Sequence, residues 1–277
     1  MEKRARKFPL YKMIPNMITL TAMASGMTSM KFAIAAAAGE THKWEWAAMA
    51  IVVAAFMDAF DGAAARILKA QSKLGAELDS FSDFVCFGVA PAFVIYLWTL
   101  QSMGKWGWPV ALVFAMAVAL RLARFNIATE EKDPENPLSK YFTGVPSPTG
   151  AGLVILPMIV TFLLDDKAHA GSADALALGY LANPQLIGIW MLVVAGMMVS
   201  NFPTFSSKQL RVPMRLKIPF LALFCAMIAA LINEPWPTLA AMGVAYLLAL
   251  PFGLAHYNKK EKSLAKGEKD PDDHEED

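Results

Sequence analysis

Four aspartates are the residues of this sequence whose type and spacing suggest chemistry. They lie in the stretch MDAFDGAAARILKAQSKLGAELDSFSDFV, which occupies positions 57–85 beside and inside apolar segments. Asp58 and Asp61 are three positions apart, and Asp79 and Asp83 are four apart. On helices each pair lies on one face. Two such helices, packed antiparallel, would therefore point their carboxylate pairs at each other.

Carboxylates gathered in a partly desolvated site repel one another and are costly to bury without a partner. The single arginine between them, Arg66, cannot neutralise four acids, whereas divalent cations can. A ligand set made only of oxygen atoms favours hard ions such as Mg²⁺, Mn²⁺ or Ca²⁺ over zinc. Two cations bridged by shared carboxylates are the usual clamp for phosphoryl chemistry. The sequence thus predicts a site for two divalent cations, Mg²⁺ or Mn²⁺.

A plainer interpretation is that these aspartates cap helix ends at a membrane–water interface, which is the usual role of a single aspartate there. The small residues Gly62, Ala63, Ala64 and Ala65 stand between the two acid pairs and leave open space beside them. A bulky ligand needs such space, so four acids at this spacing favour a binding site. The stretch KAQSKLG can reverse the chain, with Gly75 suited to a tight bend or a close helix approach.

The elements that must hold these acids are hydrophobic. Of the 277 residues, 56% are hydrophobic and 18% are charged, which is typical of an integral membrane protein. We expect an all-α, polytopic membrane helix bundle with about eight transmembrane helices, in one domain over residues 1–256 and a charged, disordered tail over 257–277. The expected spans are roughly 14–38, 44–63, 80–101, 107–125, 148–165, 185–202, 217–233 and 236–256.

Lysine and arginine predict how these spans are oriented. If the amino terminus is cytoplasmic and the sides alternate, the outer side holds only Lys31, Lys43, Lys105 and Lys167 of the 25 basic residues. This asymmetry follows the positive-inside rule and places both termini and the acid site on the cytoplasmic side of a cell (inner) membrane. The net charge of +1 gives no reason to expect a nucleic-acid partner.

The acid stretch resembles the signature of the CDP-alcohol phosphatidyltransferase family, D-x2-D-G-x2-A-R-x8-G-x3-D-x3-D. Every fixed position and every spacer of that pattern is present between Asp58 and Asp83. The resemblance implies that Asp58, Asp61 and Asp79 bind two metal ions, and that Asp83 both binds metal and acts as general base. It further implies that the donor substrate contacts the following residues: Asn16, Met17, Ile18, Thr19, Gly62, Arg66 and Ser72.

Other stretches are similar to the serine-using branch of that family, the CDP-diacylglycerol–serine O-phosphatidyltransferases. They are IPNMITLTAMASG, DSFSDFVCFGVAPA, LRLARFN at 120–126 and YFTGVPSP at 141–148, so the resemblance covers roughly residues 14–150. It implies CDP-diacylglycerol and L-serine as substrates, in contact with membrane lipids. Arg121 and Arg124 are candidates for binding the serine carboxylate, and equally for anchoring a helix at the interface.

Three alternatives stay open at this point. A sister enzyme with glycerol 3-phosphate, inositol or choline as acceptor shares the aspartate motif. A cation-coupled transporter could also carry acids within its helices, although these acids lie near one membrane face. Small residues at Gly26 and Ala33–Ala38 would allow close helix contacts, either within one chain or in a homodimer.

Overall fold

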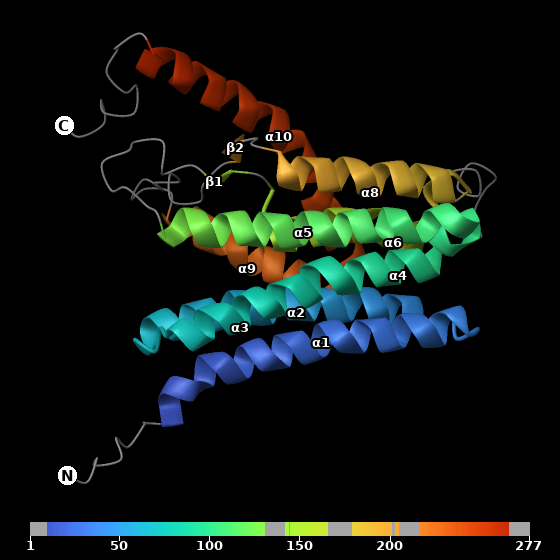
Figure 1. Ribbon diagram of the computed structural model, residues 1–277, viewed down its shortest axis with the longest axis horizontal. Coiled ribbons are helices and arrows are strands. Elements are labelled where there is room, and N and C mark those ends of the chain that lie inside the picture. Colours follow the sequence, from blue (N-terminus) through green and yellow to red (C-terminus); the bar gives the residue numbers. More distant parts are fainter. Residues whose placement is uncertain are drawn as a thin grey trace.

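The fold is helical, as expected for an all-α protein. The computed structural model describes residues 10–130, 142–143, 145–165, 179–200, 203–204 and 217–265. Besides the helices, these ranges contain two short strands, β1 (Phe142–Thr143) and β2 (Pro203–Thr204), which pair in an antiparallel ladder. Figure 1 shows the helices running along a common long direction, with α10 crossing them at an angle.

The helices have the following bounds: α1 (Ile14–Ala37), α2 (Lys43–Ile67), α3 (Lys73–Asp83), α4 (Ala90–Trp98), α5 (Gly107–Glu130), α6 (Ser147–Asp165), α8 (Pro184–Val199), α9 (Lys217–Asn233) and α10 (Pro235–Ala265). Short 3-10 turns precede α1 and α5, at η1 (Leu10–Met13) and η3 (Leu100–Trp106). A π-helical turn, η2 (Phe84–Val89), joins α3 to α4 without a break. Residues Lys73–Trp98 therefore form one long helix.

The membrane expectation is supported in part. Within the described ranges, four helical segments are long and apolar enough to cross a membrane, at Lys43–Ile67, Lys73–Trp98, Leu100–Ala128 and Ser147–Leu164. The apolar parts of α8, α9 and α10 are shorter, and α1 is long but carries Lys31 and several threonines and serines. These features indicate a multi-pass membrane protein, but they do not confirm eight spans.

Two boundaries differ from the expected ones. The third helix begins at Lys73 rather than near residue 80, because the Ser72 hydroxyl accepts a hydrogen bond from the Gly75 amide at 3.0 Å and caps it there. Helix α10 continues to Ala265, into the segment expected to be a disordered tail. The stretch NKKEKSLA at 258–265 contains three lysines with a glutamate, a leucine and an alanine, and these residue types favour helix even in a highly charged stretch. Residues 266–277 lie outside the described ranges.

Helices α1, α2 and the long α3–α4 helix lie side by side in one half of the molecule, and α5, α6 and α8 lie in the other (Figure 1). The two halves meet through α4, which contacts both α5 and α6. A buried apolar core fills this junction, and its members include Val94, Ile95, Phe114, Val118, Leu153, Met158, Met191 and Val194. The core thereby fixes α3, at the other end of the long helix, relative to α5.

The small residues of α1 are used inside the chain. Gly26, Ala33 and Ala36 are buried, and α1 makes its most extensive contact with α2. A Cβ atom on Gly26 would lie 2.8 Å from the Cys86 Sγ atom, closer than such contacts allow. These residues let helices of one chain approach closely, and the homodimer stays a prediction.

Candidate functional site

The four aspartates come together where α2 ends and α3 begins. Residues 68–72 reverse the chain between these helices, and Lys69 takes a left-handed backbone conformation there, with φ of 48°. Gly75 does not make the bend, because it already lies in the first turn of α3. A Cβ atom on Gly75 would lie 3.0 Å from the Asn16 side-chain oxygen, so this glycine permits a close approach of α1.

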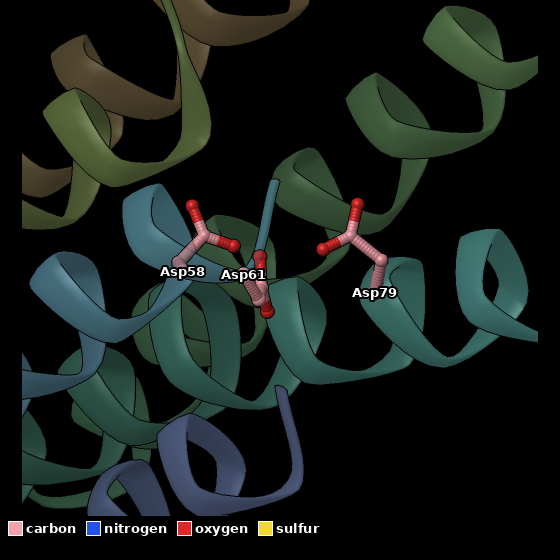
Figure 2. A group of neighbouring side chains, drawn as sticks. All are labelled: Asp58, Asp61 and Asp79. Carbon is pink, nitrogen blue, oxygen red and sulfur yellow. The ribbon is translucent and has the colours of Figure 1, made fainter. Parts of the chain in front are cut away.

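Three of the acids form a compact group of ligand atoms. One carboxylate oxygen from each of Asp58, Asp61 and Asp79 lies within 4.8 Å of the other two. Asp58 and Asp79 point toward a common space from neighbouring helices, with Asp61 between them (Figure 2). Asp61 is 4% exposed, whereas Asp79 is solvent-accessible, so the group is open on the Asp79 side. The convergence predicted from the spacing of these acids is thus present.

Asp83 completes the group from the second helix. Its carboxyl group lies in hydrogen-bonding range of the Asp58 carboxyl group, and Asp79 is a further electrostatic neighbour. Two carboxylates at such a separation repel each other unless a proton or a cation lies between them. The Asp61 Oδ2 and Asp83 Oδ1 atoms are buried and have no hydrogen-bond partner among the described residues. Unpartnered buried oxygens in an all-carboxylate set fit hard divalent cations, so this cluster could hold metal ions.

Helix α1 contributes two of its four expected residues to the same region. The Thr19 hydroxyl is buried and lies in hydrogen-bonding range of the Asp61 carboxylate and, at 3.0 Å, of the Pro15 carbonyl oxygen. Asn16 lies against the first turn of α3. Met17 is 62% exposed and so lies outside this packed cluster, while Ile18 is half-buried. The substrate contacts expected of these residues remain predictions.

The remaining candidates line the approach to the acids. Gly62 is exposed, and nothing lies within 4 Å of the position that a Cβ atom would take. The Arg66 Nε atom donates to the Gly62 carbonyl oxygen at 3.2 Å, and the rest of this exposed guanidinium stays accessible. Ser72 is exposed at the amino terminus of α3. Open space beside the glycine, flanked by a cation, is suited to an anionic ligand.

Hydrogen bonds between α1 and the long helix hold the acids of α3 in place. The Ser82 hydroxyl donates to the Thr19 carbonyl oxygen at 3.2 Å, and the Cys86 thiol donates to the Ala22 carbonyl oxygen at 3.3 Å. The π-helical turn η2 follows Asp83 directly. π-helical turns are rare in proteins, and many of those that occur lie at functional sites. Cys86 is a free cysteine and is buried, so it packs in the core.

Sequence reasoning named Arg121 only as one of two candidates, and it missed the partners of this residue. The Arg121 Nη1 atom donates to the Ser147 hydroxyl at 2.6 Å, and its electrostatic neighbours are the acid Asp83 and the phenol of Tyr246. The other candidate, Arg124, donates through Nη1 to the Val199 carbonyl oxygen at 2.7 Å. Ser147 belongs to the stretch YFTGVPSP, one of the stretches that resemble the family. Nothing in the sequence distinguished Tyr246 from the other residues of its apolar span.

Comparison with known proteins gives the family. The model of the CDP-alcohol phosphatidyltransferase family matches residues 12–182, and a second model, CDP-alcohol phosphatidyltransferase 2, matches residues 215–251. The match extends along the chain beyond the motif-bearing half.

Several relatives carry the name CDP-diacylglycerol–serine O-phosphatidyltransferase. The protein of Mycobacterium tuberculosis is 31% identical over 253 residues, which are 91% of this chain and 81% of the relative. That of Helicobacter pylori is 35% identical over 196 residues, 70% of this chain and 74% of the relative. That of Bacillus subtilis is 38% identical over 144 residues, 52% of this chain and 74% of the relative. With its full aspartate motif gathered between two apolar helices, this chain belongs to the CDP-alcohol phosphatidyltransferase family.

Proposed function

We propose that the protein transfers the phosphatidyl group of CDP-diacylglycerol to the hydroxyl group of L-serine, giving phosphatidylserine and CMP. The observation that carries this proposal is the convergence of Asp58, Asp61 and Asp79 beside Asp83 in an otherwise apolar helix bundle. The serine acceptor rests on the names of the relatives, which include proteins from distant bacteria.

The four aspartates are the residues that would hold two divalent cations, Mg²⁺ or Mn²⁺. When bound, such ions neutralise the charge of a diphosphate and stabilise the nucleotide as it leaves. The unpartnered buried oxygens of Asp61 and Asp83 support this assignment, because burying carboxylates without a counter-charge is costly.

Asp83 acts as the general base. Asp83 is half-buried, and a carboxylate that is partly removed from water beside other acids is a suitable proton acceptor. The serine hydroxyl oxygen attacks the phosphorus atom of the phosphatidyl group while Asp83 takes the hydroxyl proton. A new phosphorus–oxygen bond forms to serine, the bond to the CMP oxygen breaks, and CMP leaves.

The donor lies on the Gly62 side of the cluster. Gly62 allows the nucleotide to approach the backbone of α2, and Arg66 pairs with a phosphate oxygen. Ser72 and the segment Asn16–Thr19 contact the donor from the adjacent helix ends. No atom of the described residues lies within 4 Å of a Cβ position on Gly62, which supports this placement.

The reaction takes place where a membrane meets the cytoplasm. CDP-diacylglycerol keeps its acyl chains in the bilayer, whereas serine arrives from water, so a site at the ends of apolar helices serves both substrates. The distribution of lysine and arginine supports a cytoplasmic position for both termini and the acids in the cell (inner) membrane.

The test is an acceptor panel with purified protein in lipid nanodiscs that contain CDP-diacylglycerol and either Mn²⁺ or Mg²⁺. L-Serine, glycerol 3-phosphate, inositol and choline are added in turn, and CMP is measured. We expect CMP release that depends on L-serine, together with phosphatidylserine as lipid product. CMP release with another alcohol alone would reassign the protein to a sister activity. Absence of CMP with every alcohol would contradict a transferase and favour a cation-coupled transporter.

A further inference from the structure

A second polar group, separate from the four acids, lies beside Asp83. It consists of Arg121 of α5, Ser147 at the start of α6, and Tyr246 of α10. Ser147 is fully buried, and its hydroxyl accepts the hydrogen bond from Arg121 Nη1 at 2.6 Å. This contact fixes one edge of the guanidinium group and so sets the direction in which the rest of it points.

Two polar atoms of this group are buried and have no hydrogen-bond partner in the part of the chain that the structure describes. They are Nε of Arg121 and the hydroxyl oxygen of Tyr246. Each residue is an electrostatic neighbour of the other, although the two positions are far apart in the sequence. Buried donors in folded proteins are almost always hydrogen-bonded. Two donors without acceptors at one place therefore indicate a ligand that carries acceptor oxygens.

The neighbours of Arg121 indicate which substrate supplies those oxygens. The arginine is an electrostatic neighbour of Asp83, the acid assigned as base, and Asp83 must contact the hydroxyl group of the acceptor. Arg66, by contrast, lies beside Gly62 on the donor side. In L-serine the carboxylate is separated from the hydroxyl oxygen by only two carbon atoms. A cation next to the base is therefore within reach of that carboxylate.

Charge leads to the same conclusion. An acceptor that carries a carboxylate must enter a site that already holds four acidic side chains. Like charges at such distances repel strongly where water is scarce. An arginine held beside Asp83 offsets that repulsion, and a guanidinium group forms strong charge-assisted hydrogen bonds with a carboxylate.

We propose that Arg121 and Tyr246 together bind the carboxylate of the acceptor amino acid, with Ser147 positioning the arginine. This inference rests on the proposed function, because it assigns a place to L-serine in the same site. It makes the two residues determinants of acceptor specificity, which select an amino acid over an alcohol that lacks the carboxylate.

The first test is Arg121→Met, measured as initial rates of CMP release over ranges of both substrates. We expect KM for L-serine to rise about 10- to 150-fold, the range for loss of a hydrogen bond to a charged group. We expect KM for CDP-diacylglycerol to change less than about twofold. Lys105→Met is the control, because Lys105 lies over the Trp106 ring in η3, before the start of α5, and this variant should leave KM for L-serine near that of the wild type.

The second test separates the carboxylate charge from the rest of the acceptor. L-Serinamide, which has a neutral amide in place of the carboxylate, is measured as a substrate or as a competitive inhibitor. The wild-type protein should prefer L-serine, and Arg121→Met should reduce that preference by the same factor by which it raises KM. If Arg121→Met fails to fold, as judged by its melting temperature, the same comparison is made with Arg121→Lys.

Tyr246→Phe provides an independent variant that keeps the aromatic ring and removes only the hydroxyl group. We expect it to raise KM for L-serine about 2- to 12-fold, which is the range for the loss of one ordinary hydrogen bond. Tyr96→Phe is its control, because Tyr96 packs edge-on against Trp108 and not beside the acids.

Four outcomes would overturn the inference. A rise in KM for CDP-diacylglycerol alone would assign Arg121 to a donor phosphate. A fall in kcat with both KM values unchanged would make it a counter-charge for the acids. An unchanged preference for L-serine over L-serinamide would exclude carboxylate binding. Wild-type protein that releases no CMP with L-serine would overturn the proposed function, and this inference with it.

Discussion

Gly62→Ala should make the protein more stable and less active. Gly62 lies inside α2 and has the negative φ of a helical residue, unlike Gly39 and Gly104. Alanine favours a helix over glycine by about 0.5–1 kcal/mol. In the described ranges, a Cβ atom at this position would meet no atom within 4 Å, so no steric cost offsets that gain.

The loss of activity follows from the same open space. If the nucleotide of the donor packs against the backbone at Gly62, the added methyl group must displace it. Overpacking of a close contact costs about 1–3 kcal/mol, which corresponds to a roughly 5- to 150-fold decrease in kcat/KM for CDP-diacylglycerol. The hydrogen bond from Arg66 Nε to the Gly62 carbonyl oxygen does not involve the Cβ position and should persist.

The assay combines initial rates of CMP release at varied donor concentration with thermal unfolding in the same nanodiscs. Gly152→Ala is the matched control, because Gly152 is also exposed, lies inside α6, and has no atom within 4 Å of its Cβ position. We expect both variants to keep or gain stability and only Gly62→Ala to lose activity. A Gly62→Ala protein with unchanged kcat/KM would refute the placement of the donor against α2.

Three further predictions follow from the site and its support. Asp83→Asn should lower kcat by about 10²–10⁴-fold while partly retaining donor binding, and near-wild-type CMP release would contradict its role as base. Chelation of divalent cations should abolish CMP release, and added Mn²⁺ should restore it. Mn²⁺ should also raise the melting temperature of the wild type, because a ligand that binds the folded state stabilises it. The melting temperature of Asp61→Asn should rise less, and equal rises would exclude Asp61 as a metal ligand. Gly26→Ala should destabilise the protein by about 1–3 kcal/mol, since the new Cβ atom would lie 2.8 Å from Cys86 Sγ; an unchanged melting temperature would show that α1 can move away.

Much of the fold was predictable because helices are specified by local patterns. Apolar runs marked the positions of the helices that the structure describes, and a spacing of three or four residues placed each aspartate pair on one face. Boundaries were less predictable. The stretch KAQSKLG was expected to reverse the chain up to Gly75, whereas the cap at Ser72 starts the helix at Lys73, inside that stretch. Hydropathy did not settle the number of spans either, because α1 is long enough to cross a membrane but contains several polar residues.

The acids Asp58, Asp61, Asp79 and Asp83 lie on two consecutive helices joined by a short turn, so their order and spacing in the sequence were enough to predict that they meet. Tyr246 and Arg121 belong to helices that are distant in sequence, and no periodicity relates them. Only the packing of α4 against α5 and α6, and of α10 against α6, brings Tyr246 near Arg121 and Arg121 near Asp83. Local spacing thus determined the acid cluster, whereas the tertiary structure decided what surrounds it, because contacts between distant segments depend on how whole helices pack.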